Sequence, residues 1–318
     1  MKIFITGAAG FIGFSLSLDL LKKKHIVYGI DNLDNYYSLK LKKERLRILK
    51  KYKNFNFKKV DISKIKQLNN YLKNKNFDII FHFAAQAGVR YSIIAPKKYI
   101  KSNIKGFKNI ISSFGKKKFK FFFFASSSSV YGDIKKFPLK ENFRLFPNNL
   151  YAKTKVKNES DARMFSHVHK KKLIGLRFFT VYGEWGRPDM LILKLLSHNK
   201  KNLFLNLNND GNHYRDFTYI NDVIKILNKL IHKKFFKYDV YNICSSRPIF
   251  IKQAVNKIIK IIKYKKIKKI KKNKLEVFKT YGDNTRIKKL LSLDNFTNFN
   301  TGLMRTINWY KKKGHKFF

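Results

Sequence analysis

The sequence predicts an α/β fold, in which helices cover both faces of a doubly wound parallel sheet and a smaller α/β lobe lies beside it. Two observations support this: short apolar strands alternate with helical segments through the first half of the chain, and glycines fill the first strand-to-helix turn. After about Thr180 the pattern becomes irregular and richer in loops. We therefore expect residues 1–177, together with about 216–242, to form the larger domain, and residues 178–215 and 243–318 to form the lobe.

Strand and helix signals alternate in order from residue 2 to residue 179. Short apolar runs predict strands at 2–7, 25–31, 55–62, 78–85, 120–129 and 173–179. Between them, the segments 11–24, 39–52, 64–75, 96–114 and 151–170 are expected to be helices. The lysine-rich segment 257–274 has apolar residues close to helical spacing, and we expect a surface helix there.

The composition excludes several classes of protein. Hydrophobic residues make up 44% and aromatic residues 16% of the 318 residues, which excludes intrinsic disorder for most of the chain. The single cysteine, Cys244, excludes a disulfide framework and a cysteine-based zinc site, so a reducing cytoplasm is the simplest compartment and no metal is expected. Neither a signal peptide nor a membrane span is visible in the sequence.

The net charge of +52 is typical of proteins that bind nucleic acid or an anionic membrane. However, the lysines are scattered with Asn, Ile and Phe through the whole chain. We interpret the charge as a bias of composition and expect neither nucleic acid nor a membrane as partner. The alternative, a basic nucleic-acid-binding protein, would need cations and stacking aromatic residues gathered on one face.

Gly7, Gly10 and Gly13 lie between the first strand and the first helix, in TGAAGFIG. Glycines there bring backbone amides close to a pyrophosphate at the positive end of the helix, so the pattern indicates a Rossmann dinucleotide site. Asp31 ends the second strand, where a carboxylate binds the ribose hydroxyls and repels a 2′-phosphate, which favours NAD over NADP. Asp61 either meets the adenine edge or caps the following helix.

A second group of residues suits acid–base chemistry. The serine run SSSSVYG at 126–132 is followed by Tyr151 and Lys155, which share a helix face because they are four residues apart. A free tyrosine ionises near pH 10, and a neighbouring ammonium together with the positive charge of a nicotinamide would favour the phenolate. As an alternative, both residues are surface positions of a lysine-rich helix.

Eight segments carry a family resemblance: TGAAGFIG, DNLDNYY, HFAAQAGVRYS, ASSSSVYG, YAKTK, RFFTVYGEWGRPDM, RDFTYI and YNICSSRP. In this order and spacing they resemble the extended short-chain dehydrogenase/reductase family, and within it most closely the bacterial UDP-glucuronate 4-epimerases. The resemblance implies tightly held NAD, a UDP-uronic acid substrate, a homodimer, and reversible conversion of UDP-glucuronate to UDP-galacturonate through a transient 4-keto sugar. Another UDP-sugar 4-epimerase or a UDP-glucuronate decarboxylase is the alternative within enzymes.

The resemblance implies roles for individual residues. The catalytic residues would be Ser127, Tyr151 and Lys155. We expect NAD to contact Gly7, Gly10, Phe11, Ile12, Gly13, Asp31, Asn32, Asp61, Ile62, Phe83, Ala84, Ala85, Asn103, Tyr151, Lys155 and Phe178. We expect the substrate to contact Arg90, Ser127, Ser128, Ser129, Thr180, Arg187 and Arg215.

Arginines stand out in a chain whose usual cation is lysine, because a planar guanidinium grips phosphate or carboxylate through two hydrogen bonds. Arg215, helped by Arg187, is expected to clamp the pyrophosphate. Alternatively, Arg187 serves a contact between lobes or subunits, and Arg90 braces a loop. Arg177 is expected to pair structurally.

The uronate carboxylate needs restraint, since a 4-keto uronate loses CO₂ when the breaking bond lies perpendicular to the carbonyl plane. Thr180, Ser128 and Ser129 are expected to hold the carboxylate by neutral hydrogen bonds. Three positions depart from the family pattern, and they concern nucleotide affinity and loop shape: Phe14, Glu184 and Glu276.

Overall fold

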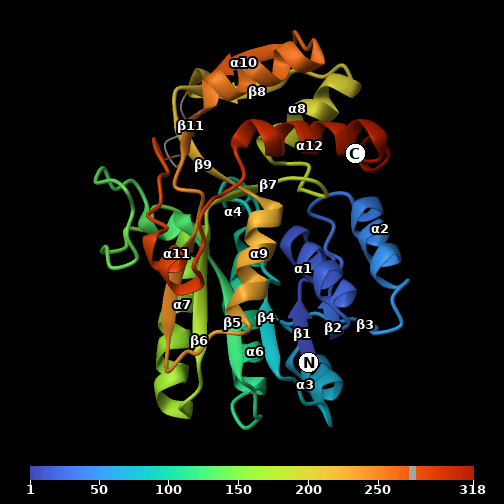
Figure 1. The fold of residues 1–318 in the computed structure, drawn as a ribbon, viewed down its shortest axis with the longest axis vertical. Coiled ribbons are helices and arrows are strands. Elements are labelled where there is room, and N and C mark those ends of the chain that lie inside the picture. Colours follow the sequence, from blue (N-terminus) through green and yellow to red (C-terminus); the bar gives the residue numbers. More distant parts are fainter. Residues whose placement is uncertain (272–276) are drawn as a thin grey trace.

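The structure, a computed structural model, describes residues 1–271 and 277–318 (Figure 1). Its main element is a seven-stranded sheet with the order β10-β6-β5-β4-β1-β2-β3, in which every neighbouring pair is parallel. The strands are β1 (Lys2–Thr6), β2 (Ile26–Asp31), β3 (Phe55–Lys59), β4 (Ile79–His82), β5 (Phe121–Ser127), β6 (Leu173–Phe178) and β10 (Asp239–Ile243). The predicted doubly wound parallel sheet is confirmed.

Helices cover both faces of this sheet. One face carries α1 (Phe11–Lys22), α2 (Leu39–Leu49) and α9 (Ile220–Leu230), and the other carries α3 (Ile65–Leu72), α6 (Phe107–Ser113) and α7 (Leu150–His169). The aromatic strand β5 supplies both cores, because successive side chains of a strand point to opposite faces. Phe121 and Phe123 join the first core, whereas Phe122 and Phe124 join the second.

The helix expected over 96–114 is divided into three parts. The segment contains α5 (Pro96–Tyr99), a π-helix η1 (Ile100–Gly106) and α6, and the short α4 (Tyr91–Ile94) precedes it. The π-helix widens the turn around Asn103, whose buried amide donates to the Gln86 carbonyl and to the Thr154 hydroxyl. Apolar spacing gives no signal for this change of winding.

The lobe lies at the end of the main sheet where the parallel strands finish (Figure 1). It contains a three-stranded sheet of order β11-β9-β7 and a two-stranded sheet of β12 and β8. Their bounds are β7 (Thr180–Tyr182), β8 (Leu205–Asn208), β9 (Tyr214–Tyr219), β11 (Pro248–Phe250) and β12 (Ile267–Ile270). The helices of this part are α8 (Leu191–Lys200), α10 (Ile251–Ile262) and α12 (Phe299–Lys312), whereas α11 (Thr285–Leu291) packs on β10 and α9 of the main sheet. Among the described residues, the short 3₁₀ turns are η2 (Ser128–Tyr131), η3 (Asn209–Gly211) and η4 (Gly314–Phe317).

The prediction of one surface helix over 257–274 is wrong. Helix α10 ends at Ile262, where Lys263 adopts the left-handed conformation with φ 52°, and residues 267–270 pair with β8 as β12. The Tyr264 hydroxyl donates to the Leu203 carbonyl, and this hydrogen bond fixes the turn between α10 and β12. Pairing with a distant strand thus overrides the local helical spacing, and residues 272–274 of the segment lie outside the described residues.

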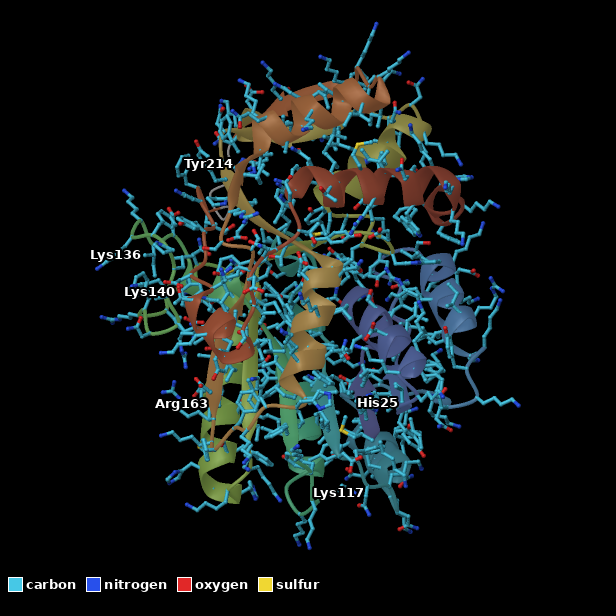
Figure 2. The ribbon with its side chains drawn as sticks, viewed as in Figure 1. His25, Lys117, Lys136, Lys140, Arg163 and Tyr214 are labelled. Atoms are coloured by element: carbon cyan, nitrogen blue, oxygen red, sulfur yellow. The ribbon has the colours of Figure 1, made fainter. Side chains whose placement is uncertain are left out.

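Side chains with nitrogen atoms at their ends extend from all sides of the visible outline; the labelled Lys136 and Lys140 lie at the left edge and Lys117 at the bottom (Figure 2). This distribution agrees with a bias of composition. In the part of the chain that the structure describes, no helix is long and apolar enough to cross a membrane.

Candidate active site

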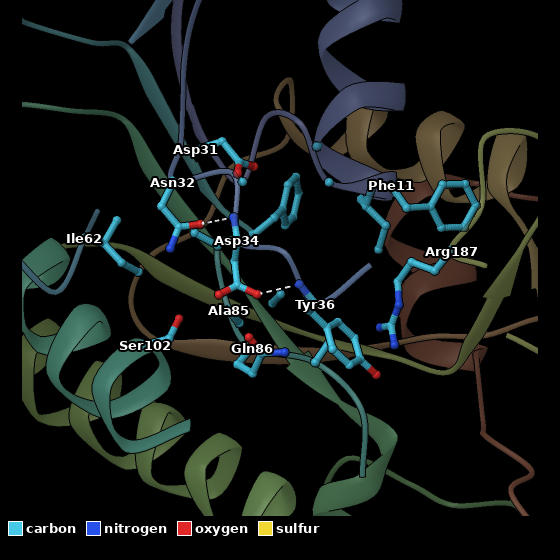
Figure 3. Close-up of a pocket in the computed structure, with 18 of the residues that line it drawn as sticks. Phe11, Asp31, Asn32, Asp34, Tyr36, Ile62, Ala85, Gln86, Ser102 and Arg187 are labelled. Atoms are coloured by element: carbon cyan, nitrogen blue, oxygen red, sulfur yellow. Dashed lines mark hydrogen bonds between the residues drawn. The ribbon is translucent and has the colours of Figure 1, made fainter. Parts of the chain in front are cut away.

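A cavity of about 400 Å³ lies at the carboxyl ends of the parallel strands, next to the lobe. Residues that end or follow strands β1 to β6 line it, together with residues from α7 and from the loop after β7. Asp31, Asn32 and Ile62 lie toward one end of this cavity, and Arg187 and Phe11 lie toward the other (Figure 3). The carboxyl edge of such a sheet is the usual place for ligand binding in this kind of fold.

The glycine loop leaves backbone amides available at this cavity. Gly7 has φ +74°, and a Cβ added at Gly13 would lie 2.1 Å from the Gly7 carbonyl oxygen, so α1 packs closely on β1 only with glycine. Gly10 is the N-cap of α1 and makes no side-chain capping hydrogen bond. The first amides of a helix have no acceptor within it, and those of α1 border the cavity. The loop therefore fits a pyrophosphate.

Asp31 is 8% exposed and connects β2 to the glycine loop. Its carboxylate accepts hydrogen bonds from the Ala9 amide at 3.1 Å and from the Leu33 amide at 2.8 Å. Burial raises the pKa of this carboxyl, and the charges of Lys42 and Arg45 with the two amides oppose that rise. Asp31 thus shapes the loop in addition to facing the cavity, a role that sequence reasoning missed.

The structure gathers nearly all residues expected to hold NAD. The residues that line the cavity are Gly7, Gly10, Phe11, Ile12, Gly13, Asp31, Asn32, Asp61, Ile62, Phe83, Ala84, Ala85, Tyr151, Lys155 and Phe178. Asn103 does not line it, because its amide is engaged behind the wall, where its Oδ1 accepts from the Gln86 amide at 2.7 Å. Gln86 does line the cavity, so Asn103 supports it.

Asp61 is not the N-cap of α3. The N-cap is Lys64, and Asp61 Oδ1 instead accepts hydrogen bonds from the amide and hydroxyl of Ser63, at 2.9 and 2.7 Å. Asp61 also pairs with Lys101 at 3.6 Å on the cavity wall. The adenine contact of Asp61 stays a prediction.

Ser127, Tyr151 and Lys155 meet at the end of β5. Ser127 is the last residue of the strand, and its hydroxyl acts on Tyr151, the second residue of α7, while donating to Ser129 Oγ at 3.2 Å. Lys155 lies one turn further, with its Nζ 5.9 Å from the Tyr151 ring centroid, and it donates to the Ala125 carbonyl at 2.8 Å. All three side chains line the cavity, so the alternative of two surface positions is wrong for Tyr151 and Lys155.

The electrostatics at Tyr151 differ from the expectation. Burial raises the pKa of the Tyr151 phenol, and the hydrogen bond from Ser127 and the charge of Arg187 lower it only in part. Burial also lowers the pKa of Lys155 to about 8, while Glu159 raises it. The protein groups around Tyr151 together therefore raise the pKa of its phenol above the usual value.

Most of the residues expected to bind the substrate lie outside the cavity lining. Ser128 and Ser129 lie in η2 and are half-buried, and Thr180 begins β7, but none of the three is part of the cavity lining. Arg90 is exposed before α4, and Arg215 lies on β9, where its Nη1 donates to the Tyr214 carbonyl at 2.7 Å. Neither arginine lines the cavity.

Arg187 lines the cavity but already has an anionic partner. Its guanidinium donates to both oxygens of Asp189, and the Tyr36 hydroxyl donates to Asp189 Oδ2 at 3.0 Å. Tyr36 follows β2, so this group joins the larger domain to the lobe across the cavity. The interlobe alternative for Arg187 and its proximity to the ligand site are therefore compatible.

Sequence reasoning missed further residues of the cavity wall. Polar examples are Asp34, Tyr36, Tyr37, Lys42, Gln86, Lys98, Lys101 and Ser102. Lys42 is 6% exposed, and its Nζ donates to the Asp34 carbonyl at 2.5 Å. The segment DNLDNYY carries the signal that could have found the first three, because a polar loop directly after the strand with Asp31 must border the same edge.

Two departures from the family pattern serve packing. Both oxygens of Glu184 accept from the Tyr219 hydroxyl, at 2.8 and 2.7 Å, which ties the loop after β7 to β9. Phe14 is 1% exposed, and its ring centroid lies 5.3 Å from that of Trp185. Glu276 lies outside the described residues.

Arg177 pairs structurally, as expected. It forms a buried ion pair with Glu159. Within residues 1–271 and 277–318, no group of three or more His, Cys, Asp or Glu side chains is arranged to hold a metal ion.

Known proteins share this fold and much of this sequence. Residues 3–244 match the NAD dependent epimerase/dehydratase family. An uncharacterised protein of Methanocaldococcus jannaschii is 43% identical over 97% of this chain and 96% of its own length. The UDP-glucuronate 4-epimerase of Thermodesulfobacterium geofontis is 34% identical over 97% of this chain and 95% of its own length.

A solved structure is similar over nearly the whole chain. The UDP-glucuronic acid 4-epimerase of Bacillus cereus, in complex with UDP-glucuronic acid and NAD, superposes with a TM-score of 0.92 and 29% sequence identity. The match covers 98% of this chain and 99% of that one.

Proposed function

The chain belongs to the NAD-dependent epimerase/dehydratase family, and on that premise we propose that it interconverts UDP-glucuronate and UDP-galacturonate by inverting C4 of the uronic acid. One observation carries the proposal: Ser127, Tyr151 and Lys155 share a cavity with a glycine loop and with Asp31. This combination puts an acid–base group beside a dinucleotide site. The relatives that act on UDP-glucuronate supply the substrate class.

NAD fits the residues that are present. The amides at the start of α1 suit its pyrophosphate, and Asp31 suits the adenosine ribose. When bound, NAD supplies the reversible oxidation at C4 and the positive charge that favours the tyrosinate.

The side chains of the site handle the proton. Tyr151 takes the proton of the 4-hydroxyl and returns it to the other epimer, because it is the phenol within reach of Ser127. The Ser127 hydroxyl passes this proton between the sugar and Tyr151, or holds the sugar hydroxyl by a hydrogen bond during the transfer. Lys155 stays cationic below about pH 8, and its charge stabilises the phenolate at neutral pH.

The remaining residues hold the substrate. Arg215 clamps the pyrophosphate, and Arg187 adds a second guanidinium at the cavity wall. Thr180, Ser128 and Ser129 hold the uronate carboxylate away from the geometry that releases CO₂, with Arg90 contributing charge nearby. On the cofactor side, Asn103 accepts a hydrogen bond from the Gln86 amide and so holds Gln86 in the cavity wall.

Incubation with UDP-glucuronate tests the function directly. The purified protein should release NAD on denaturation and convert UDP-glucuronate to UDP-galacturonate, identified by chromatography and NMR. Equal turnover of UDP-glucose would favour the broader alternative of another UDP-sugar epimerase, and a UDP-pentose product would favour a decarboxylase. Nucleic-acid binding without turnover would contradict the enzyme assignment.

We also propose a homodimer located in the cytoplasm. Large apolar side chains are exposed on two neighbouring parts of the larger domain: Ile93 and Ile94 on α4, Ile100 on η1, and Met164 and Val168 on α7. Their burial against a second copy would remove apolar surface from water. Light scattering should give twice the mass of one chain.

The cytoplasmic location is supported by the lone thiol, since Cys244 is free and fully buried, which suits a reducing compartment.

A further inference from the structure

Glu159 belongs to the same helix face as the acid–base residues. It lies on α7 four residues after Lys155 and eight after Tyr151, so all three side chains point toward the sheet. Lys155 donates to the Ala125 carbonyl at 2.8 Å, and Glu159 Oε1 accepts from the Ser126 hydroxyl at 2.6 Å. The helix therefore holds two consecutive residues of β5 directly before Ser127.

Arg177 fixes Glu159 from the neighbouring strand. Arg177 pairs with Ser126 in the register of β6 and β5, and its guanidinium reaches both oxygens of Glu159, at 2.9 Å from Nε and 2.7 Å from Nη2. The two side chains are 4% and 7% exposed. A buried bidentate pair of this kind has one geometry, because any displacement would leave a charge without its partner.

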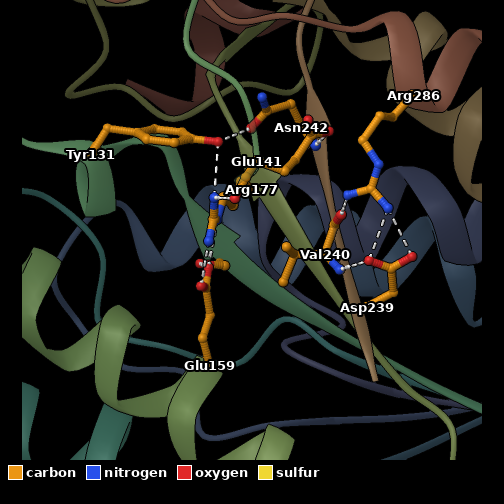
Figure 4. A network of polar contacts seen from close by, with 9 residues as sticks. Tyr131, Glu141, Glu159, Arg177, Asp239, Val240, Asn242 and Arg286 are labelled. Atoms are coloured by element: carbon orange, nitrogen blue, oxygen red, sulfur yellow. Dashed lines mark hydrogen bonds and ion pairs between the residues drawn. The ribbon is translucent and has the colours of Figure 1, made fainter. Parts of the chain in front are cut away.

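The same guanidinium also reaches the far end of the serine segment. Its Nη1 donates to the Tyr131 hydroxyl at 2.9 Å and to the Glu141 carbonyl at 3.0 Å, and the Tyr131 hydroxyl donates to Asn242 Oδ1 at 2.7 Å (Figure 4). Tyr131 ends η2, the turn that follows β5. The segment 127–130 is thus held at both ends by groups bound to Arg177.

We propose that Glu159 is a positioning residue for the epimerisation, which with Arg177 fixes the serine segment against Tyr151 and, as the carboxylate one helical turn away, supports the positive charge of Lys155. This inference rests on the proposed function of the site. It adds a residue that touches neither the cavity nor a reacting atom, since Glu159 is absent from the cavity lining. It gives the buried ion pair a role beyond packing.

Glu159 also acts on Lys155 through its charge. Burial lowers the pKa of Lys155 to about 8, and the Glu159 carboxylate opposes that effect. The titratable groups that act directly on Lys155 are Tyr151 and Glu159 on α7 and His82 on β4. One contact further away, Tyr99 on α5 and Arg187 face Tyr151, and Arg177 on β6 faces Glu159. Of these, Glu159 is the anion, so its removal should make Lys155 lose its proton at a lower pH.

Ser126→Ala tests the geometric part. It removes the hydrogen bond to β5 and leaves the Glu159–Arg177 pair intact. We expect kcat to fall about tenfold, from the loss of one charge-assisted hydrogen bond, with KM and the pH profile almost unchanged. Bound NAD should remain. A kcat equal to that of the wild type would overturn the positioning role.

Glu159→Gln tests the electrostatic part. Activity should fall as pH rises through the pKa of Lys155, and in this variant the fall should come at a lower pH than in the wild type. Asp161→Asn is the matched control, because Asp161 is a 4% exposed carboxylate of the same helix that pairs with Lys157. The control should not move the pH profile.

The outcomes separate the two proposals. A wild-type protein inactive on UDP-glucuronate contradicts the proposed function. An active wild type with an unmoved basic limb in Glu159→Gln contradicts the inference alone. If Glu159→Gln fails to fold, the kcat of Ser126→Ala decides the question.

Discussion

The two sides of the cavity differ in how their residues come together. On the side of the larger domain, residues from the ends of several strands meet at one edge, and residues expected there line the cavity. On the side of the lobe, Thr180 and Arg215 are expected at the ligand but lie outside the lining, and Arg187 is paired with Asp189.

The difference has a physical cause. Parallel strands with right-handed connections bring all their carboxyl ends to one edge, so chain order alone brings Gly7, Asp31 and Ser127 together. The lobe has no such rule, because its short strands form two separate small sheets, one of which contains the antiparallel pair β11–β9. We infer that the cofactor side tolerates little change, whereas changes on the lobe side tune binding and product choice.

The first prediction tests the cofactor side, where the largest effect is expected. Tyr151→Phe should reduce turnover about 10²-fold or more, because the acid–base group is removed. NAD should stay bound, since the glycine loop and Asp31 are unchanged. The measurements are UDP-galacturonate formed per minute and NAD released on denaturation.

Tyr71→Phe provides the control for Tyr151→Phe. Its hydroxyl is buried beside the second core, away from the cavity lining. That variant should keep its turnover. Near-normal turnover of Tyr151→Phe would remove the acid–base assignment.

The second prediction compares two arginines of the lobe side. Arg215→Met should raise KM for UDP-glucuronate about 10- to 100-fold, the effect of losing one or two charged hydrogen bonds to pyrophosphate. Arg187→Met should raise KM less, because the guanidinium already shares its charge with Asp189. Initial rates over a range of substrate concentration measure both.

Arg144→Met serves as the control for these variants, since Arg144 is exposed and stacks on Phe146. A larger KM effect for Arg187 than for Arg215 would reverse the assignment of the main clamp.

The fold was predictable wherever local spacing and sheet geometry agree. The main strands, the glycine turn and helix α7 follow from apolar runs and from Tyr151 and Lys155 sharing a face. The π-helix at Ile100–Gly106 and strand β12 were not predictable, because each depends on a distant partner. For η1 this partner is the Asn103 hydrogen-bond network, and for β12 it is strand β8.

The site shows the same division. The sequence identifies Gly13 because only glycine fits the close contact with Gly7, and it identifies Asp31 because a carboxylate is needed at the end of β2. The Tyr36–Asp189–Arg187 group joins residues 153 apart in sequence, and no spacing rule relates them. The lowered pKa of Lys155 also depends on burial, which the four-residue spacing of Tyr151 and Lys155 does not reveal.

The third prediction returns to the cofactor side with a smaller effect. Asp31→Ala should weaken NAD binding about tenfold or more and relax discrimination against NADP, because the carboxylate binds ribose and repels a 2′-phosphate. It also removes the hydrogen bonds to Ala9 and Leu33.

Asp31→Asn separates the two roles of Asp31. It retains an acceptor for the loop and loses only the charge, so it should relax the NADP discrimination with less loss of NAD affinity. Titration with NAD and NADP measures both constants. Equal binding of the two cofactors by the wild type would contradict the role of Asp31.

The last prediction concerns product choice on the lobe side. If Thr180 holds the uronate carboxylate, Thr180→Val keeps the volume and deletes one hydrogen bond of about 0.5 to 1.5 kcal/mol. A factor of ten in rate corresponds to about 1.4 kcal/mol. The variant should therefore still oxidise C4, yet direct several-fold more of the substrate to a UDP-4-keto-pentose and CO₂. Released CO₂ and accumulated NADH are measured against UDP-galacturonate formed.

Thr301→Val, an exposed threonine on α12, should leave this product ratio at the wild-type value. An unchanged ratio in Thr180→Val would transfer the restraint to Ser128, Ser129 or Arg90. The position of Thr180 at the start of β7, one residue before the cavity-lining Val181, makes the experiment informative. Because Thr180 lies on the lobe side and outside the glycine loop, the ratio reports on the lobe side without disturbing the cofactor side.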